Sequence, residues 1–479
     1  MRFIFFASCC LASCCAFPAG YEVSFDLAGS SATVRIRLDD AAATDFHMPA
    51  WSPGDYRIVD YGKHVTNVRF TRLGDVLSAT HPSVNHWKAS APADMVEYRV
   101  STQRAGIFSE NFRLTADEVF VHGPAVFGYF AGHQREKQSL GLTPYPGDGA
   151  QVAIGLTGIK KYTFLAKDYD ELVDSPFAMG SGVRSADFVV GGKLHQVAAF
   201  GTQSAGVALG PFVEVGQKVA TACLDIFGEL PYDKYVFLFD FGGGGGGLEH
   251  ANSARMSMWP GGARDAAGFI AHEFFHAFNV KRIRPRVLGP FDYTKPAVTG
   301  ALWWLEGVTD YYAQLITVRA GMATRESAMR SLSSEYRAFQ RMENRLKVSA
   351  DESSRRVWEA KNSSGYGINY YTKGKLIGWV LDLAIRGETG GKKSLDDVMR
   401  ALYAETKGDK PGFAETRIRE LCVQIGGEAL GPIYDDCVIK PVDLPIAGVL
   451  PGVGMQLLGG IVRDDPAAKS PAGAEWPMR

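Results

Sequence analysis

The stretch His272-Glu273-Phe274-Phe275-His276 decides how this 479-residue chain is interpreted, because it has the pattern H-E-x-x-H. Two histidines four residues apart project from one face of a helix, so both imidazoles can bind one metal ion. Glu273 can then act as a general base on a metal-activated water. Two core histidines of an ordinary buried helix are the alternative. The pattern predicts metal-dependent hydrolysis, most often of a peptide bond.

The surrounding sequence predicts an amphipathic helix over about residues 265–280. Its apolar residues recur with helical spacing: Phe269, Ile270, Phe274, Phe275 and Phe278. Asp265 follows a Gly261-Gly262 break and is the candidate N-cap residue. The motif therefore lies within a predicted helix, as joint metal binding by the two histidines requires.

A third ligand is expected downstream, because a catalytic zinc ion takes three protein ligands and keeps one position open. Glu306 follows His276 by 30 residues, which is enough chain for a second helix to return beside the first. Its neighbours Trp303 and Trp304 would make a bare carboxylate costly to bury, although a solvated glutamate is the competing interpretation. Asp310, on the same helix face, is expected to orient a ligating imidazole.

A second candidate site lies upstream, where the apolar run 235–239 predicts a buried strand. Six glycines, 242–247, come next and are followed by Glu249. By composition the run is a flexible linker, and it lacks the Gly-Lys-Ser/Thr ending of a phosphate loop. Its position predicts instead that the backbone of the run approaches a neighbouring segment closely. The residues that follow, up to Trp259, are predicted to form an edge strand that can pair with a peptide. Glu249 would bind the free α-amino group of that peptide, unless it is an ordinary surface glutamate.

These segments resemble the glycyl-aminopeptidase family of zinc metallopeptidases. The resemblance covers most of the chain and rests on residues 48–56, 247–253, 272–285 and 306–312. That family is related to the aminopeptidase N-like gluzincins, which share a thermolysin-like catalytic domain. Phe278 stands where the family usually has Trp, a change in packing that leaves the metal ligands untouched.

The resemblance implies a role for each residue of the metal site. One Zn²⁺ per chain would be bound by His272, His276 and Glu306, and Glu273 would be the general base. Glu249 matches the acidic residue of the exopeptidase Gly-x-Met-Glu-Asn loop, which holds the amino terminus of the substrate. Here the loop reads Gly-Gly-Leu-Glu-His, so the residue after the glutamate differs.

Tyr371 is the implied oxyanion donor, because the segment Tyr-Thr-Lys-Gly at 371–374 is similar to the Tyr-x-Lys-Gly segment of gluzincin aminopeptidases. Its hydroxyl would donate a hydrogen bond to a charge that develops only in the transition state. Tyr370 and Tyr366 are close in sequence, and any of the three tyrosines can instead be a packing residue.

Together these features predict a zinc-dependent aminopeptidase that releases N-terminal residues from peptides by attack of a metal-activated water. The family suggests that the released residue is small, Gly or Ala, whereas the sequence itself does not show the size of that pocket. A zinc endopeptidase on the same scaffold and a non-catalytic peptide-binding protein are the alternatives. Glu273 argues against the latter, since a structural metal site has no use for a base.

Composition limits the partners and the redox chemistry. The formal net charge is -1 and no long run of like charge is present, so nothing favours a nucleic-acid partner. The short basic cluster 281–284 is interpreted as a helix C-terminal charge arrangement or a local ion-pair site, not as a nucleic-acid patch. In an oxidising compartment Cys422 and Cys437 would be able to pair, although Cys is also a common core residue. Nothing in the sequence indicates an oligomeric state.

The N-terminus is interpreted as a targeting segment, because Arg2 precedes an apolar stretch, 3–17, that is too short to span a membrane. Residues 11–14 resemble a bacterial lipobox, which would leave Cys14 carrying a lipid anchor. Ordinary cleavage near Ala16 or Ala19 is the alternative. We expect an exported protein that is periplasmic, secreted or lipid-anchored in a bacterial envelope.

The chain is predicted to be a multidomain α+β protein. The predicted parts are a signal segment (1–19), an N-terminal β-sandwich (20–163), a thermolysin-like catalytic domain (164–321), a helical domain (322–443) and a tail or PDZ remnant (444–479). Strand-like runs punctuated by Pro, Gly and Asp indicate the sandwich, and Gly321 is expected to end the helix that carries Glu306. Relatives often carry a C-terminal PDZ domain, for which the last stretch is too short.

Overall fold

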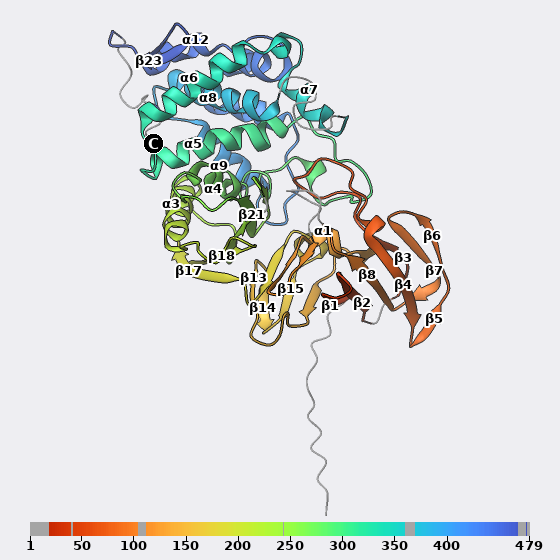
Figure 1. Ribbon diagram of the computed structural model, residues 1–479. Coiled ribbons are helices and arrows are strands. Elements are labelled where there is room, and N and C mark those ends of the chain that lie inside the picture. The colour runs from red at the N-terminus through yellow and green to blue at the C-terminus, as the bar shows by residue number, and fades with distance from the viewer. Residues whose placement is uncertain are drawn as a thin grey trace, which may run out of the picture.

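The computed structural model describes residues 19–39, 42–103, 112–242, 244–359, 369–467 and 476. The predicted signal segment up to residue 18, the lipobox residue Cys14 and Tyr366 lie outside these residues. The first part of the described chain is built of strands and the last part of helices (Figure 1). No helix in the described ranges is long and apolar enough to cross a membrane.

Three sheets form the N-terminal region, as predicted for a β-rich domain. The largest has the order β14-β15-β12-β1-β2-β8-β4-β5, with bounds Thr157–Lys160, Thr163–Ala166, Gln138–Leu142, Ala19–Asp26, Ser31–Leu38, Met95–Ser101, Val65–Arg72 and Asp75–Leu77. The others are β11-β3-β7-β6 (Tyr129–Phe130, Ala43–His47, His86–Ala93, Ala79–Ser83) and β13-β16-β10-β9 (Gln151–Ile154, Phe177–Gly180, Glu118–Val121, Phe112–Leu114). Alternation decides which side chains enter the core: in β2, Val34 and Ile36 are buried and Arg35 and Arg37 are exposed.

A five-stranded mixed sheet supports the candidate site. Its order is β17-β18-β19-β21-β20, with bounds Arg184–Val190, Lys193–Phe200, Lys234–Phe241, Ser253–Met258 and Gly246–Glu249. The predicted buried strand is β19, which pairs in parallel with β18 and β21 on its two sides. Helices α3 (Gly210–Phe227) and α4 (Ala267–Phe275) pack against this sheet.

The structure corrects the predicted edge strand. The edge is β20, which ends at Glu249, whereas β21 lies between β19 and β20. The polar alternation of β21 suggested exposure, but Arg255 is buried and forms an ion pair of 2.6 Å with the buried Asp240. A buried charge that is paired can occupy an interior strand.

The helix of the H-E-x-x-H motif is also shorter than predicted. It spans Ala267–Phe275 and is preceded by Ala266, which makes no side-chain cap, so Asp265 is not its N-cap residue. The chain leaves the helix after His276, and Val280 has a φ of 133°, a conformation that a helix cannot contain.

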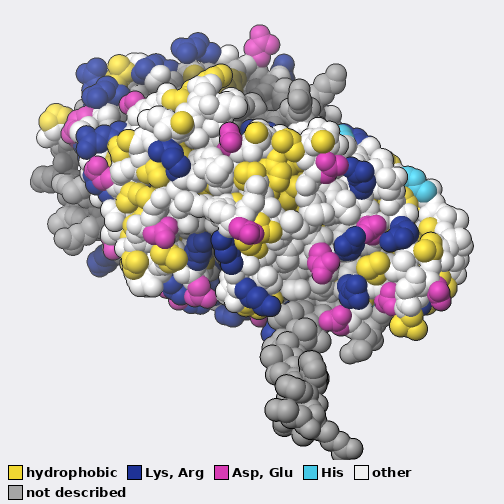
Figure 2. Space-filling view, turned by 60° about the horizontal axis from the view of Figure 1, so that its bottom comes forward, with side chains coloured by type: hydrophobic (Ala, Val, Ile, Leu, Met, Phe, Trp, Pro, Cys, Tyr) yellow, Lys and Arg dark blue, Asp and Glu magenta, His cyan; other side chains and the backbone are white. Residues whose placement is uncertain are grey.

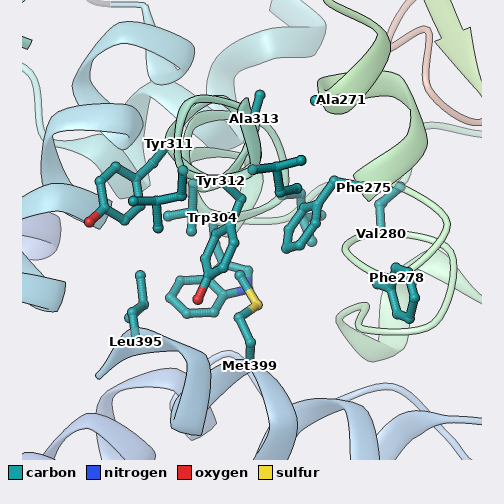
Figure 3. Packing of buried hydrophobic residues seen from close by; sticks show 14 of the residues in the cluster. Ala271, Phe275, Phe278, Val280, Trp304, Tyr311, Tyr312, Ala313, Leu395 and Met399 are labelled. Atoms are coloured by element: carbon teal, nitrogen blue, oxygen red, sulfur yellow. The ribbon is translucent and has the colours of Figure 1, made fainter. Parts of the chain in front are cut away.

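Helices dominate the described chain after the mixed sheet, and those named here carry or pack around the site. They are η3 (Trp303–Val308), α5 (Thr309–Arg319), α6 (Arg325–Gln340), α7 (Ala350–Arg355), α8 (Tyr370–Thr389), α9 (Leu395–Thr406), α10 (Arg417–Gly426), α11 (Leu430–Tyr434) and α12 (Ile446–Val449). Gly321, with a φ of 66°, follows α5 as predicted. Phe275 of α4 stacks on Tyr312 of α5 at 4.5 Å, and Leu395 and Met399 of α9 lie beyond Tyr312 (Figure 3).

One hydrophobic core joins the mixed sheet to these helices and to the end of the described chain. Its members include Leu450, Met455 and Trp476 from the predicted tail. The hairpin of β22 (Met455–Leu458) and β23 (Ile461–Asp464) packs there as well. Cys422 and Cys437 are buried free thiols in this core, so the pairing that the sequence left open is not formed and both are core residues. The domain boundaries drawn from the sequence remain predictions.

The surface carries charges of both signs. On the face in Figure 2, Lys and Arg side chains alternate with Asp and Glu over most of the visible surface. No wide patch of one sign is visible on that face, which agrees with the near-zero formal net charge.

Candidate active site

The three predicted metal ligands meet between α4 and η3. The Nε2 atoms of His272 and His276 are 3.0 Å apart, and Oε2 of Glu306 lies 3.7 Å and 3.3 Å from them. Donor atoms about 2.0–2.1 Å from a tetrahedral zinc ion are separated by roughly 3.3 Å. The three side chains therefore fit a zinc ion with little movement.

The surrounding residues hold both imidazoles in the orientation that such an ion requires. Nδ1 of His272 lies 2.8 Å from Oδ1 of Asp310, as predicted, and Nδ1 of His276 donates to the backbone carbonyl of Asn279 at 2.7 Å. Each ring thus directs Nε2 toward Glu306. Glu306 itself is on a π-helical turn, a distortion that is frequent at functional sites.

Asn279 joins the two ligand-bearing segments and was missed by the sequence analysis. Its side-chain amide donates to the carbonyl of Trp304 at 2.8 Å and to Oγ1 of Thr309 at 3.0 Å. Its backbone carbonyl accepts the hydrogen bond from Nδ1 of His276. The only sequence feature that pointed to it was its position, three residues after the second histidine of the motif. Its contacts cross from the turn after α4 to η3, so spacing could not reveal them.

Burial and the imidazoles set the charges of the two glutamates. Burial raises the pKa of Glu306, but the adjacent His276 and His272 outweigh that effect and hold its pKa well below the usual range. Burial raises the pKa of Glu273 to about 7, against the opposing effect of the same imidazoles. A carboxylate with a pKa near neutrality is suited to general-base work at neutral pH.

The glycine run brings the edge strand onto Glu273. A Cβ atom on Gly247 would lie 2.1 Å from Oε1 of Glu273, so only glycine permits this approach. The end of the run is therefore a place of close contact, as its position predicted, and not merely a linker. Strand β20 passes directly over the candidate base.

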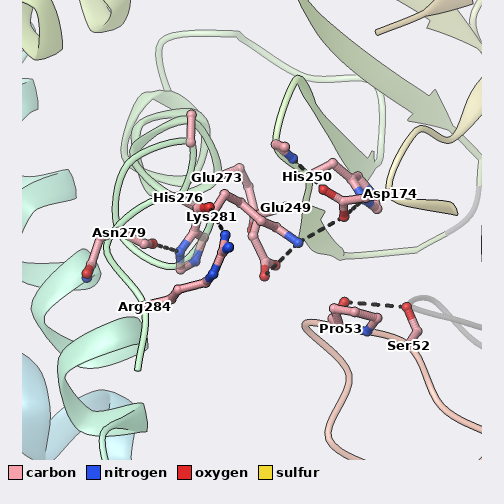
Figure 4. A network of polar contacts seen from close by, with 12 residues as sticks. Ser52, Pro53, Asp174, Glu249, His250, Glu273, His276, Asn279, Lys281 and Arg284 are labelled. Carbon is pink, nitrogen blue, oxygen red and sulfur yellow. Dashed lines mark hydrogen bonds and ion pairs between the residues drawn. The ribbon is translucent and has the colours of Figure 1, made fainter. Parts of the chain in front are cut away.

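Glu249, at the end of β20, is buried, and its Oε1 accepts no hydrogen bond from the described residues. The ammonium of Lys281 lies 3.9 Å from that oxygen but donates to Oδ1 of Asp174 at 2.9 Å (Figure 4). His250 lies 3.0 Å from the same Asp174 oxygen. Burial alone would raise the pKa of Asp174, yet Lys281 and His250 lower it well below the usual range.

This network explains what Lys281 does. Its charge is balanced by the ionised Asp174, as the interpretation of the basic cluster as an ion-pair site suggested. The carboxylate of Glu249 is therefore left with hydrogen-bonding capacity toward the site. Asp174 is the C-cap residue of α2 (Tyr169–Val173), within the N-terminal region, and no motif connected it to Glu249.

A loop of the N-terminal region covers Glu249. A Cβ atom on Gly54 would lie 2.6 Å from Leu248 Cδ1 and 2.9 Å from Glu249 Oε1. Tyr56 is buried in the same loop, and its pKa is raised by burial and by the carboxylates of Glu306 and Glu249. Trp358 packs edge-on against Tyr56 at 5.9 Å. The segment 48–56 therefore forms part of the site.

Tyr371 is in the first turn of α8, with its ring 6.2 Å from that of His272. Burial and the charge of Glu306 raise the pKa of Tyr371 well above its ordinary value, so its hydroxyl remains a donor at neutral pH. Tyr370 is buried against it with ring centroids 4.9 Å apart. Of the two described tyrosines, Tyr371 is the more accessible, and its ring lies beside that of the candidate metal ligand His272.

Known structures share this fold. An aminopeptidase N family protein from Idiomarina loihiensis is 23% identical with a TM-score of 0.84, over 92% of this chain and 79% of that one. The M1 zinc metallopeptidase from Deinococcus radiodurans is 12% identical with a TM-score of 0.57, over 89% of this chain and 95% of that one. A mutant of the Deinococcus enzyme bound to its substrate Tyr-Ser-Ala is similar at a TM-score of 0.56, with 12% identity over 89% and 94% of the two chains.

Sequence comparison is more specific than this likeness of folds. No curated protein matches the chain significantly. Residues 20–181, however, match the N-terminal domain of the M61 peptidases, and residues 265–377 match the M61 glycyl aminopeptidases. The two ranges include the loop over Glu249, the H-E-x-x-H helix, Glu306 and Tyr371. The chain therefore belongs to the M61 glycyl aminopeptidase family of peptidases.

Proposed function

We propose that this peptidase is a zinc-dependent aminopeptidase. The observation that carries the proposal is the buried carboxylate of Glu249, whose Oε1 has no hydrogen-bond donor among the described residues. It is on the same short strand as Gly247, which touches the candidate base Glu273. A peptide α-ammonium is a cation that would satisfy this carboxylate.

His272, His276 and Glu306 would hold the zinc ion. When bound there, zinc lowers the pKa of a coordinated water and polarises the scissile carbonyl. Glu273 takes up the proton of the attacking water on its carboxylate and passes it to the departing amine nitrogen. The Tyr371 hydroxyl donates a hydrogen bond to the carbonyl oxygen as negative charge develops on it.

The edge strand would hold the substrate backbone. Among the described strands, β20 is paired on one side alone, with β21. An extended peptide can add to its other edge by backbone hydrogen bonds. With the α-ammonium held at Glu249, the first peptide bond is the one that comes next to Glu273, so a single residue is released at a time.

A small N-terminal residue, Gly or Ala, is the preference that we propose. The loop over Glu249 supports this, because Gly54 closely approaches both Leu248 and Glu249, and the ring of Tyr56 is buried nearby. A panel of aminoacyl-coumarins would test it, with Gly and Ala substrates turned over faster than Leu or Phe. Faster cleavage of the large residues would refute the preference.

Two substitutions test the mechanism. Glu273→Gln should retain zinc and lose turnover, since the amide cannot accept the proton. Glu249→Gln should weaken binding of free-amine peptides, because a charge-assisted hydrogen bond becomes a neutral one. Glu214→Gln, on the exposed side of α3, is the matched control and should change neither property. Equal cleavage of free and N-acetylated peptides by the wild-type protein would exclude the role of Glu249 and favour an endopeptidase.

We also propose that the protein is exported, with either an ordinary signal cleavage or a lipid anchor at Cys14. The apolar N-terminal segment supports the proposal. Mass spectrometry of the mature N-terminus from a bacterial envelope fraction would distinguish the two cases. An intact Met1 in the mature protein would exclude both.

A further inference from the structure

A second group of potential metal ligands is in the N-terminal region, on β3 and β7, which Figure 1 shows apart from α4. In the antiparallel pairing of these strands, Phe46 is opposite Trp87 and His47 is opposite His86. Phe46 and Trp87 are buried in the core. Because side chains alternate along a strand, Asp45, His47 and His86 share the other face of the sheet.

The three side chains are already gathered. Nε2 of His86 is 2.8 Å from Oδ1 of Asp45, and the rings of His47 and His86 are stacked with centroids 4.3 Å apart. One donor atom from each residue lies within 4.8 Å of the other two. The ring of Tyr129, on the adjacent strand β11, stacks on His47 at 5.6 Å and limits its movement.

We propose that Asp45, His47 and His86 form a second metal site, for a divalent transition ion of the Zn²⁺, Ni²⁺ or Cu²⁺ class. Two imidazoles and one carboxylate are donors that such ions prefer, whereas Ca²⁺ and Mg²⁺ take oxygen ligands. Tetrahedral zinc requires donor separations of roughly 3.3 Å, so the most distant pair must close by at most about 1.5 Å. The rings of His47 and His86 must also turn out of their stacked arrangement, because the lone pair of an imidazole nitrogen lies in the plane of its ring. The side chains of His86 and Asp45 are 23% and 28% exposed, which leaves room for that rotation.

The charges around the group permit a cation. Lys88 Nζ lies 4.0 Å from Oδ1 of Asp45, but its side chain is 55% exposed and can turn into solvent. Binding would break the hydrogen bond between Nε2 of His86 and Asp45, release the proton of that nitrogen and leave the remaining coordination positions to water.

Equilibrium dialysis of the full chain against Zn²⁺, followed by metal analysis, tests the proposal. The wild-type protein should bind two zinc ions per chain, and His86→Ala should bind one while its peptidase activity is unchanged. His81→Ala is the matched control, because His81 stacks on Trp87 in the same sheet but is not among the clustered donors, and it should still bind two.

A second measurement distinguishes binding at this group from binding at an unrelated weak site. Cu²⁺ added to protein that carries a single equivalent of zinc per chain should give an electron paramagnetic resonance spectrum with coupling to two nitrogen nuclei, and His47→Ala should reduce this to one. Equal numbers of zinc ions bound at saturation by the wild-type protein and by His86→Ala would overturn the proposal. Because the readouts count ions and ligands, they do not depend on the proposed aminopeptidase activity.

Discussion

Gly374→Ala should disable the peptidase without touching any proposed catalytic side chain. Gly374 is at the point where α8, which carries Tyr371, crosses η3, which carries Glu306. A Cβ atom there would lie 2.2 Å from the carbonyl oxygen of Trp303 and 2.9 Å from Cα of Gly307. In return, a Cβ on Gly307 would lie 2.4 Å from Cα of Gly374. These are backbone atoms, so no side-chain rotation can relieve the clash.

The size of the effect follows from these distances. Ordinary contact begins near 3.4 Å, so the two segments must separate by about 1 Å. A displacement of about 1 Å in a catalytic group costs on the order of 100-fold in rate, or about 2.7 kcal/mol in activation free energy. Overpacking should lower the free energy of unfolding by about 1–3 kcal/mol, offset in part by the better helix propensity of Ala, about 1 kcal/mol.

The assay compares kcat, KM, zinc content and urea unfolding of the variant and the wild type, with an alanyl-coumarin as substrate. We expect kcat to fall on the order of 100-fold with zinc retained. Gly268→Ala is the matched control, because Gly268 is on α4 and no atom would lie within 4 Å of its new Cβ. That control should keep its kcat and be equally or more stable.

A double variant identifies the residue through which Gly374→Ala acts. If the substitution misplaces the Tyr371 hydroxyl, then adding Tyr371→Phe should lower kcat little further, because the effects of residues that act as one unit are not additive. A folded, zinc-loaded Gly374→Ala protein with the wild-type kcat would refute the reasoning. So would a Tyr371→Phe effect of the same size in both backgrounds.

Three further outcomes are expected. Asn279→Ala removes two buried hydrogen bonds between the ligand-bearing segments, so the free energy of unfolding of the zinc-loaded protein in urea should fall by about 2–3 kcal/mol. Asp310→Ala frees the His272 ring and should weaken zinc binding about 10–100-fold in chelator competition. Burial lowers the pKa of Lys373 to about 8, so between pH 8 and about 10.4 only the unfolded chain binds its proton. Stability should therefore rise with pH across that window, by at most about 3 kcal/mol, and Lys373→Met should remove the rise; identical pH profiles of the two proteins would contradict this.

The three candidate metal ligands could be proposed from the sequence because each of their constraints is local. His272 and His276 are related by one helical turn, and Glu306 is in an apolar segment where a lone carboxylate needs a partner. Asp310 followed from the same helical spacing. Glu249 was suggested by its position after the glycine run and supported by the resemblance to the glycyl aminopeptidases, which also supplied Tyr371. The structure places both next to the ligand set.

The residues that the sequence did not reveal act across long separations. Asp174 accepts a hydrogen bond from Lys281, which is 107 positions further along the chain, and Gly54 contacts Glu249 from the N-terminal region. The predicted edge strand was wrong for a related reason. The polar residues of β21 indicated exposure to solvent, but Arg255 is paired with Asp240 on a neighbouring strand. The order of strands is a property of the whole sheet, which local sequence does not determine.

Glycine is the common element where the three regions of the chain converge on the site. Gly54 lets the N-terminal loop contact Glu249, Gly247 lets β20 contact Glu273, and the pair of Gly307 and Gly374 lets α8 contact η3. Each contact brings backbone, which is stiff, against a group that must be held within a fraction of an ångström. The ligand set is built by α4 and η3 alone, but the covering of Glu249 requires the N-terminal region. The proposed limitation of cleavage to one residue would therefore depend on how the regions pack, and we expect it to be lost before metal binding if that packing loosened.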